Sequence, residues 1–179
     1  MNAVNQDANN RDVWSQPRQV AWFAAAQGFV DASERVLVER LGREYAGGDV
    51  LDVGVGGGRT VPLLRSWAGR YVGIDYLPEL VAAARHRYPD ADLRVGDARQ
   101  LEFPDGSFDV ALFSINGLDA VSHEDRASAL GEIRRVLRPT GTFVFSSHNA
   151  DGPGPSERPW NIPSVSIRQP RSSLRAAAR

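Results

Sequence analysis

Residues 50–60 read VLDVGVGGGRT and join a short apolar run to a helical pattern. Glycines at a strand-to-helix turn let the backbone turn tightly and approach a ligand closely. The N-terminus of the following helix offers backbone N–H groups to a carboxylate or phosphate. The spacing is D-x-G-x-G-x-G, and the dinucleotide pattern G-x-G-x-x-G fails because Arg59 stands at its last position. The alternative interpretation is a tight turn without a ligand.

Short apolar runs alternate with helical patterns over about a hundred residues around this stretch. The predicted strands are 50–53, 71–75, 93–95, 108–114 and 142–146, and the predicted helices between them are 60–67, 78–87 and 123–137. Such alternation indicates a parallel sheet covered by helices on both faces. We therefore expect an α/β fold, a three-layer α/β/α sandwich with a mainly parallel sheet of about five strands.

The segments around this core carry weaker signals. Residues 20–30 predict a helix, and Asp31 or Ser33 is the predicted N-cap of a second helix. Residues 139–141 predict a turn. The predicted buried face of the helix 123–137 consists of Ala127, Leu130, Ile133, Val136 and Leu137.

Three segments are expected along the chain. Residues 1–19 predict a flexible N-terminus and residues 20–149 predict the folded domain. Residues 150–179 form a tail rich in proline and arginine. Its five prolines do not fit central strands or helices, so we expect it to be irregular.

The composition is that of an ordinary globular protein, with 42% hydrophobic and 24% charged residues among 179. A formal net charge of −1 gives no general attraction to nucleic acid or anionic membranes. The absence of cysteine excludes disulfides and thiolate metal sites, and three histidines alone indicate no metal site. No run approaches a membrane span of about 20 apolar residues, and the N-terminus does not resemble a signal peptide. We therefore expect a cytoplasmic protein.

Two aspartates lie at the carboxyl ends of the next two predicted strands, Asp75 as the last residue of its strand and Asp97 just after the other. Asp75 lies at about the distance from Gly54 at which an acidic residue meets ribose hydroxyls. Asp97 can place a carboxylate and a neighbouring N–H at the edge of an adenine. The alternatives are a solvated acid at a strand end for Asp75 and a turn with a local acceptor for Asp97. Because open α/β sheets bind ligands at the carboxyl ends of their strands, we expect both aspartates and the glycine loop to form one site.

Four stretches together resemble the class I, Rossmann-like S-adenosylmethionine-dependent methyltransferases. They are VLDVGVGGGRT (50–60), YVGIDYLPELV (71–81), GDARQLEFPDGSFDVALFSINGLD (96–119) and LGEIRRVLRPTGTFVFSSHN (130–149). The resemblance covers about a hundred residues in the order of the family. It implies S-adenosyl-L-methionine as the cofactor and methyl transfer to an acceptor as the activity.

The resemblance also implies roles for individual residues along four strand ends. The implied cofactor-binding residues are Asp52, Gly54, Gly56, Gly58, Asp75, Tyr76, Asp97, Ala98 and Ser114. The glycines and Asp52 would hold the methionyl part, Asp75 the ribose, Tyr76 or Leu77 the adenine face, and Asp97 with Ala98 the adenine edge. Ser114 and the two residues after it would lie beside the reactive methyl group.

The acceptor is less well defined than the cofactor. A general base is needed only where the acceptor starts protonated, and the candidates are Asn116, Asp119, His123 and His148, of which Asn116 can orient an acceptor but cannot take a proton. Residues 114–118 read SINGL, unlike the Asn/Asp-Pro-Pro-Tyr signature of methyltransferases that act on amide or adenine nitrogen. No basic patch with interleaved aromatics indicates nucleic acid. We therefore expect a small-molecule acceptor.

The chain ends about thirty residues after the fifth predicted strand, where relatives continue with a helix and two more strands. We expect the sheet to lack these strands and the fifth strand to form an exposed edge, which favours pairing with another chain or aggregation. The expected result is reduced stability or a homodimer that covers this edge. A non-catalytic or truncated S-adenosylmethionine-binding protein is therefore the alternative to an enzyme. The failed dinucleotide pattern disfavours an oxidoreductase. Aminopropyl transfer from a decarboxylated cofactor stays open, because that cofactor also carries an amino group.

Overall fold

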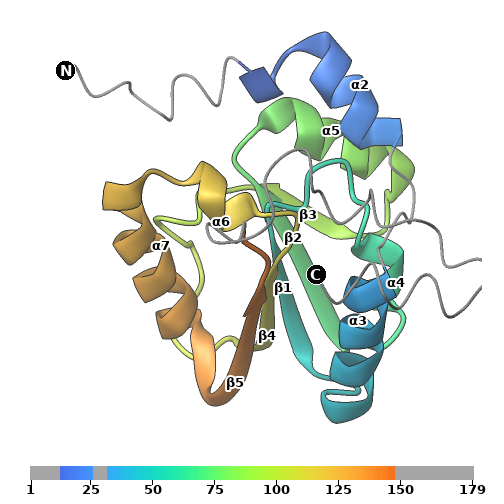
Figure 1. Ribbon diagram of the computed structural model, residues 1–179. Helices are drawn as coiled ribbons and strands as arrows, with labels where there is room; N and C mark the ends of the chain where they lie inside the picture. The colour runs from blue at the N-terminus through green and yellow to red at the C-terminus, as the bar shows by residue number, and fades with distance from the viewer. Residues whose placement is uncertain (1–12, 26–31, 148–179) are drawn as a thin grey trace, which may run out of the picture. The chain divides into compact units, whose positions relative to one another are not determined.

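A parallel sheet forms the centre of the computed structural model, which describes residues 13–25 and 32–147. Its strand order is β3-β2-β1-β4-β5, and every neighbouring pair is parallel (Figure 1). The strands are β1 (Asp49–Val53), β2 (Arg70–Asp75), β3 (Asp92–Val95), β4 (Phe108–Phe113) and β5 (Leu137–Phe145). The predicted parallel α/β fold is confirmed.

Helices cover both faces of this sheet. They are α2 (Pro17–Ala25), α3 (Ala32–Glu44), α4 (Val61–Arg65), α5 (Pro78–Arg87), α6 (Gly117–Ala120) and α7 (His123–Val136). Helices α3, α4 and α5 contribute to the core on one face, and α6 and α7 to the core on the other, as their positions in Figure 1 show. The neighbours Val50 and Leu51 are both fully buried, one in each core, which explains why this strand is continuously apolar.

The N-terminal helices differ in their bounds from the prediction. Helix α2 begins at Pro17 rather than at residue 20, and residues 26–30 of the predicted helix lie outside the described residues. Ser33 lies inside α3 and is not its N-cap, while Asp31 is outside the described residues. Of the two predicted irregular segments, residues 1–12 and the whole tail 150–179 are likewise outside.

Helix α4 is shorter than the predicted helix 60–67. It spans Val61–Arg65, with Thr60 as its N-cap residue, and the chain turns at Ser66 and Trp67 before entering β2. The chain returns so tightly here that a Cβ on Gly69 would clash with the backbone oxygen of Gly47. The four-residue helix α6 was not predicted.

The buried face of α7 differs from the prediction. Ala129, Ile133 and Val136 are buried, whereas Ala127 is exposed and Leu130 is 41% exposed. The predicted and the observed buried face share Ile133 and Val136, so the spacing of apolar residues alone could not distinguish one face from the other. The sheet selects the face that carries the small side chain of Ala129.

The last strand begins earlier than predicted. Phe108 pairs with Leu137 and Val110 pairs with Thr142, so a step of two residues along β4 corresponds to five along β5. The extra residues form a bulge that contains 139–141, which the sequence predicted as a turn between elements. Strand β4 ends at Phe113, one residue before the predicted end.

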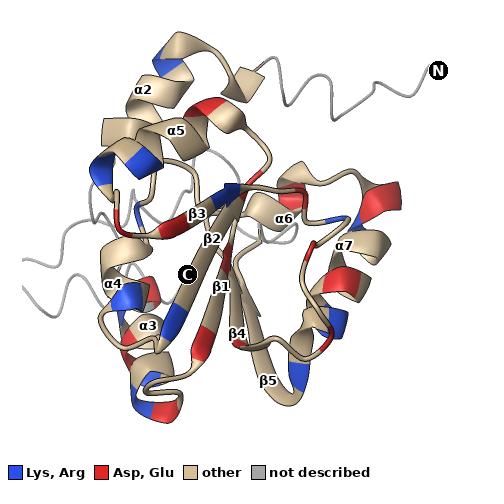
Figure 2. Ribbon diagram, turned by 180° about the vertical axis from the view of Figure 1, so that it is seen from behind, with Lys and Arg blue, Asp and Glu red and all other residues tan. Residues whose placement is uncertain are grey.

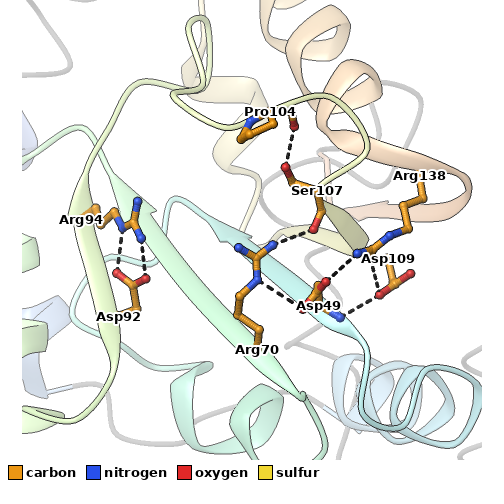
Figure 3. A network of polar contacts seen from close by, with 8 residues as sticks. All are labelled: Asp49, Arg70, Asp92, Arg94, Pro104, Ser107, Asp109 and Arg138. Carbon is orange, nitrogen blue, oxygen red and sulfur yellow. Dashed lines mark hydrogen bonds and ion pairs between the residues drawn. The ribbon is translucent and has the colours of Figure 1, made fainter.

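Ion pairs fasten four strands at the edge of the sheet where the strands begin (Figure 3). Arg138 of β5 lies 2.7 Å from Asp49 of β1 and 2.6 Å from Asp109 of β4, and Arg70 of β2 lies 3.2 Å from Asp49. Burial raises the pKa of Asp49, but the hydrogen bonds from Arg138 and Arg70 outweigh it and the pKa is lowered. We call Asp49, Arg70, Asp109 and Arg138 the amino-edge clasp.

Charged residues of both signs alternate along the outer helices α3 and α7 (Figure 2). Within residues 13–25 and 32–147, no helix has the length and apolar character that a membrane crossing requires.

Candidate functional site

The glycine loop leaves β1 at the edge opposite the clasp and leads into α4. Gly54, Gly56 and Gly58 have φ values of +67°, +54° and +87°, which L side chains rarely adopt. A Cβ on Gly54 would lie 2.8 Å from the ring of Phe113, and a Cβ on Gly58 would lie 2.8 Å from the ring of Tyr88. The three glycines of the predicted pattern therefore each meet a backbone requirement of this turn.

Asp75 ties the loop to the end of β2. Its Oδ2 accepts a 2.9 Å hydrogen bond from the N–H of Gly56, and its Oδ1 accepts one of 2.9 Å from the N–H of Leu77. Asp75 is only 6% exposed, and burial raises its pKa against the opposing effect of these two bonds. The alternative of a solvated acid is therefore wrong.

Asp52 lies beneath the loop and is fully buried. Its Oδ2 accepts hydrogen bonds from the hydroxyls of Thr60, at 2.5 Å, and Tyr71, at 2.8 Å. Its Oδ1 has no hydrogen-bond partner among the described residues. Burial raises the pKa of Asp52 to about 6, although the bonds from Thr60 and Tyr71 oppose the rise. A buried acceptor of this kind suits a cationic or N–H-bearing ligand.

Asp97 follows β3 beside the end of β2, where the N–H of Gly96 donates to the carbonyl of Asp75 at 2.9 Å. Its Oδ1 accepts from the N–H of Arg99 at 2.9 Å, and its Oδ2 lies 2.6 Å from the guanidinium of the same residue. Arg99 also pairs with Asp125 of α7 at 2.8 Å. The alternative interpretation, a turn in which Asp97 is a local acceptor, is therefore present in the structure.

The apolar residues implied for the adenine occupy the same edge with different exposure. Leu77 is 3% exposed, whereas Tyr76 is half-buried. Ala98 packs, partly buried, on the core under α6 and α7. Tyr76 and Ala98 are thus the more accessible of the three.

Ser114 contacts Arg59, which pairs in turn with Glu34, and the sequence patterns singled out neither residue as part of the site. The guanidinium of Arg59 donates to its Oγ at 2.8 Å and forms a two-pronged pair with Glu34 of α3, at 2.7 and 2.8 Å. The place of Arg59 directly after the last glycine was visible in the sequence. No pattern in the sequence connects it with Glu34, which lies 25 residues earlier.

The turn after β4 is strained. Ile115 and Asn116 have φ values of +48° and +53°, and Ile115 is β-branched, so its left-handed backbone is unfavourable. The N–H of Asn116 donates to Oγ of Ser146, after β5, at 2.8 Å. Strain of this kind occurs preferentially at functional sites, and here it lies where the acceptor was expected.

The proposed bases lie at different places. Asp119 is in α6, and its Oδ1 accepts from the hydroxyl of Ser147 at 2.7 Å, so it stands near the ends of β4 and β5. His123 is exposed at the first residue of α7, whose N-cap is Ser122. His148 lies outside the described residues. The backbone N–H of Asp119 also donates to the carbonyl of Asn116 at 2.9 Å, which ties Asp119 to the turn after β4.

Asp52, the three glycines, Asp75 and Ser114 lie along one edge of the sheet, at the carboxyl ends of β1, β2 and β4. The buried carboxylate with an unfilled acceptor and the glycine cradle suit S-adenosylmethionine, whose amino group and ribose hydroxyls are donors. The fold and this edge define a Rossmann-like methyltransferase domain.

Comparisons with known proteins agree with this class. Residues 51–145 match the family model described as a methyltransferase domain, and the chain belongs to this family of S-adenosylmethionine-dependent methyltransferases. A probable S-adenosylmethionine-dependent methyltransferase of Mycolicibacterium smegmatis is 39% identical over 115 residues, covering 64% of this chain and 43% of that protein. A phosphatidylethanolamine N-methyltransferase of Cereibacter sphaeroides is 39% identical over 117 residues, covering 61% and 55%.

A solved structure of an S-adenosylmethionine-dependent methyltransferase from Mesorhizobium loti has a TM-score of 0.57 and 28% identity, covering 66% of this chain and 55% of that one. The chain spans about half the length of the curated relatives it matches.

Proposed function

We propose that this chain binds S-adenosyl-L-methionine at the glycine loop and transfers its methyl group to a small-molecule acceptor. The observation that carries the proposal is the hydrogen bond from the Gly56 N–H to the buried carboxylate of Asp75. It joins the loop to an acidic group at the end of β2, which is where a ribose meets its acceptor in a nucleoside-binding α/β sheet.

Each part of the cofactor has a proposed partner along this edge. The unfilled Oδ1 of Asp52 supports binding of the amino group, and the positive φ of the glycines supports close approach of the methionyl chain. Asp75 binds the ribose hydroxyls. The full proposed set is Asp52, Gly54, Gly56, Gly58, Asp75, Tyr76, Asp97, Ala98 and Ser114.

Bound cofactor supplies a methyl group on a positively charged sulfur, and the protein has to align an acceptor with it. The turn of Ser114, Ile115 and Asn116 is the proposed aligning element, because its strained backbone is held by Ser146. Asp119 is the proposed proton acceptor for acceptors that start protonated. A small-molecule acceptor is supported by a relative that is named for phosphatidylethanolamine.

Calorimetric titration of the full chain with S-adenosylmethionine, S-adenosylhomocysteine and NADH tests the cofactor. We expect both adenosyl ligands to bind and NADH to bind at least tenfold more weakly. Asp75→Asn should weaken the affinity for S-adenosylhomocysteine at least tenfold, because the amide offers the ribose hydroxyls one acceptor oxygen where the carboxylate offers two. Asp92→Asn, the same change at an exposed residue of β3, is the matched control and should leave affinity within twofold. Binding of NADH alone would contradict the proposal.

A labelled-methyl assay with small-molecule fractions of a cell extract separates the enzyme from the alternative, a non-catalytic cofactor-binding protein. Transfer of label to a fraction shows catalysis and leads to the acceptor. Cofactor binding without transfer to any fraction favours the alternative.

We also propose a homodimer through β5. This strand lies at one end of the described sheet, and Phe145 near its end is 51% exposed with its ring stacked on Phe143. The other end strand, β3, carries the exposed charged pair Asp92–Arg94, which opposes edge pairing. Light scattering should show a dimer that Phe145→Lys weakens, and a monomer at all concentrations would contradict it. A cytoplasmic location stays a prediction of the sequence.

A further inference from the structure

The glycine loop contains a fourth glycine, Gly57, that the pattern D-x-G-x-G-x-G does not require. The three glycines of the pattern have positive φ values, whereas Gly57 does not, so its backbone angles alone do not call for glycine. A Cβ on Gly57 would lie 2.5 Å from the carbonyl oxygen of Phe23 and 2.9 Å from the Cα of Ala24. Glycine is therefore needed at this position because the backbone of α2 lies directly against the loop.

The side chain of Phe23 continues this contact along the loop. A Cβ on Gly56 would lie 3.9 Å from its ring, and Gly56 is the residue whose N–H donates to Asp75. The rings of Trp14 and Trp22 meet the ring of Phe23 edge to face, with centroids 5.5 and 4.8 Å away. Phe23 thus lies beside the part of the loop where the ribose of the cofactor is proposed to bind.

Helix α2 contributes no buried residue to the domain, and its Trp22 is 60% exposed. Its main contacts with another helix are with α5, beside which it lies in Figure 1, and Arg87 of α5 donates to the carbonyl of Gly57 at 3.2 Å. Helix α3, by contrast, buries Val38 and Leu41. Because an element with so little buried apolar surface opens at a low free energy, α2 can leave the loop while the rest of the domain stays folded.

We propose that α2 is a movable cover of the cofactor site and that Gly57 is the position on which it seats. The helix leaves the loop to let the adenosyl ligand in or out, and it closes against the loop when the ligand is bound. The inference rests on the proposed function, because it concerns the same site. It goes further by assigning the rate of ligand exchange to a helix and a glycine outside the proposed cofactor-binding set. Closure of such a cover keeps water from the reacting atoms, and its opening can limit turnover.

Hydrogen exchange of the full chain, with and without saturating S-adenosylhomocysteine, tests whether α2 closes on the ligand. The exchange is measured over times in which the core strands remain protected, so that α2 exchanges by opening on its own. The amides of residues 17–25 should exchange more slowly with the ligand by about tenfold or more, because the bound state holds the helix closed. Unchanged exchange of α2 in a protein that binds the ligand would overturn the inference.

Two variants displace α2 by different routes. Gly57→Ala places a Cβ against the backbone of α2, and Ala21→Pro breaks the helix at an exposed position. In stopped-flow displacement, each should speed the dissociation of S-adenosylhomocysteine by about tenfold or more and should not slow its association. The matched controls should stay within about twofold of the wild type. They are Gly131→Ala, at an exposed glycine of α7 with nothing within 4 Å, and Ala21→Gln, which keeps a good helix former in α2.

The two variants together distinguish a cover from a distorted loop. If α2 is the cover, the double variant should release the ligand no more than about twofold faster than the faster single variant, because both substitutions remove the same contact. Fast release in Gly57→Ala with wild-type release in Ala21→Pro would show that the loop itself is distorted and would overturn the inference. If Gly57→Ala does not fold, Ala21→Pro decides the test. A wild-type protein that binds no S-adenosylhomocysteine would instead overturn the proposed function, and the inference with it.

Discussion

The hydroxyl of Tyr71 donates to Oδ2 of Asp52 at 2.8 Å, the same oxygen that receives the hydroxyl of Thr60. Both donors therefore address one side of the carboxylate and leave Oδ1 unfilled among the described residues. The arrangement keeps a negative charge under the glycine loop at a cost to the folded protein, because the burial that raises the pKa of Asp52 disfavours its ionised form.

The stability of the protein should fall as the pH rises through the range in which Asp52 ionises. Its pKa rises from 3.8 to about 6 on folding, so between these values the folded state binds more protons than the unfolded state. The free energy of unfolding of the wild type, relative to Asp52→Asn, should decrease by about 2 kcal/mol between pH 4 and pH 7. Urea denaturation at several pH values measures this difference.

Asp92→Asn is a control of opposite sign. The hydrogen bond from Arg94 lowers the pKa of Asp92, so its ionised form stabilises the folded state at pH values above its ordinary pKa. The wild type should therefore gain stability relative to Asp92→Asn as the pH rises through 3.8, the ordinary pKa of this group, and the difference should be constant above about pH 5. A pH-independent difference for Asp52→Asn would show that its carboxylate is not desolvated.

Gly58→Ala should destabilise the protein more than Gly47→Ala. Both glycines have positive φ, at +87° and +77°, so both substitutions strain the backbone by about 1–2 kcal/mol. Only at Gly58 does the added Cβ meet a neighbour, the ring of Tyr88 at 2.8 Å, whereas nothing lies within 4 Å at Gly47. We expect an additional loss of about 1–3 kcal/mol from this contact, measured by urea denaturation. Tyr88→Ala in the Gly58→Ala background should recover part of it.

Arg138→Ala should cost more stability than Arg94→Ala. Arg138 joins β1, β4 and β5 through Asp49 and Asp109, whereas Arg94 pairs with Asp92 two residues away in its own strand (Figure 3). An exposed ion pair within one strand, such as that of Arg94, contributes about 0–1 kcal/mol to the free energy of unfolding. The two ion pairs of Arg138 link different strands and should together contribute about 1 kcal/mol more. Thermal melting measures the difference, and 1 M salt should reduce it. Equal melting temperatures would show that the clasp does not stabilise the sheet.

The face of α7 can be tested with two neighbouring residues. Ala129 is fully buried, so Ala129→Leu should overpack the core and cost about 1–3 kcal/mol. Leu130 is 41% exposed, and Leu130→Ala should change the free energy of unfolding by about 0.5 kcal/mol or less. Urea denaturation measures both losses. If the predicted face were the buried one, Leu130→Ala would cost more stability than Ala129→Leu.

The sequence predicted the strands and the glycine loop well because both depend on local chemistry. Continuous apolar runs indicate strands buried on two faces, and the glycines were set by backbone angles that other residues resist. The bulge in β5 depends on pairing with β4, so residues 139–141 looked like a turn between elements. The buried pair of Arg59 and Glu34 depends on how α3 packs, which no local pattern encodes.

The strand order also has a consequence for the synthesis of the chain. The central strand β1 pairs on one side with β4, and the partners Val50 and Val110 are about 60 residues apart. At a translation rate of about 5–20 residues per second, this side of β1 waits about 3–12 seconds for its partner to be made. During that time an apolar strand has one unpaired edge. Chaperones should therefore reduce aggregation most while β1 has been made and β4 has not.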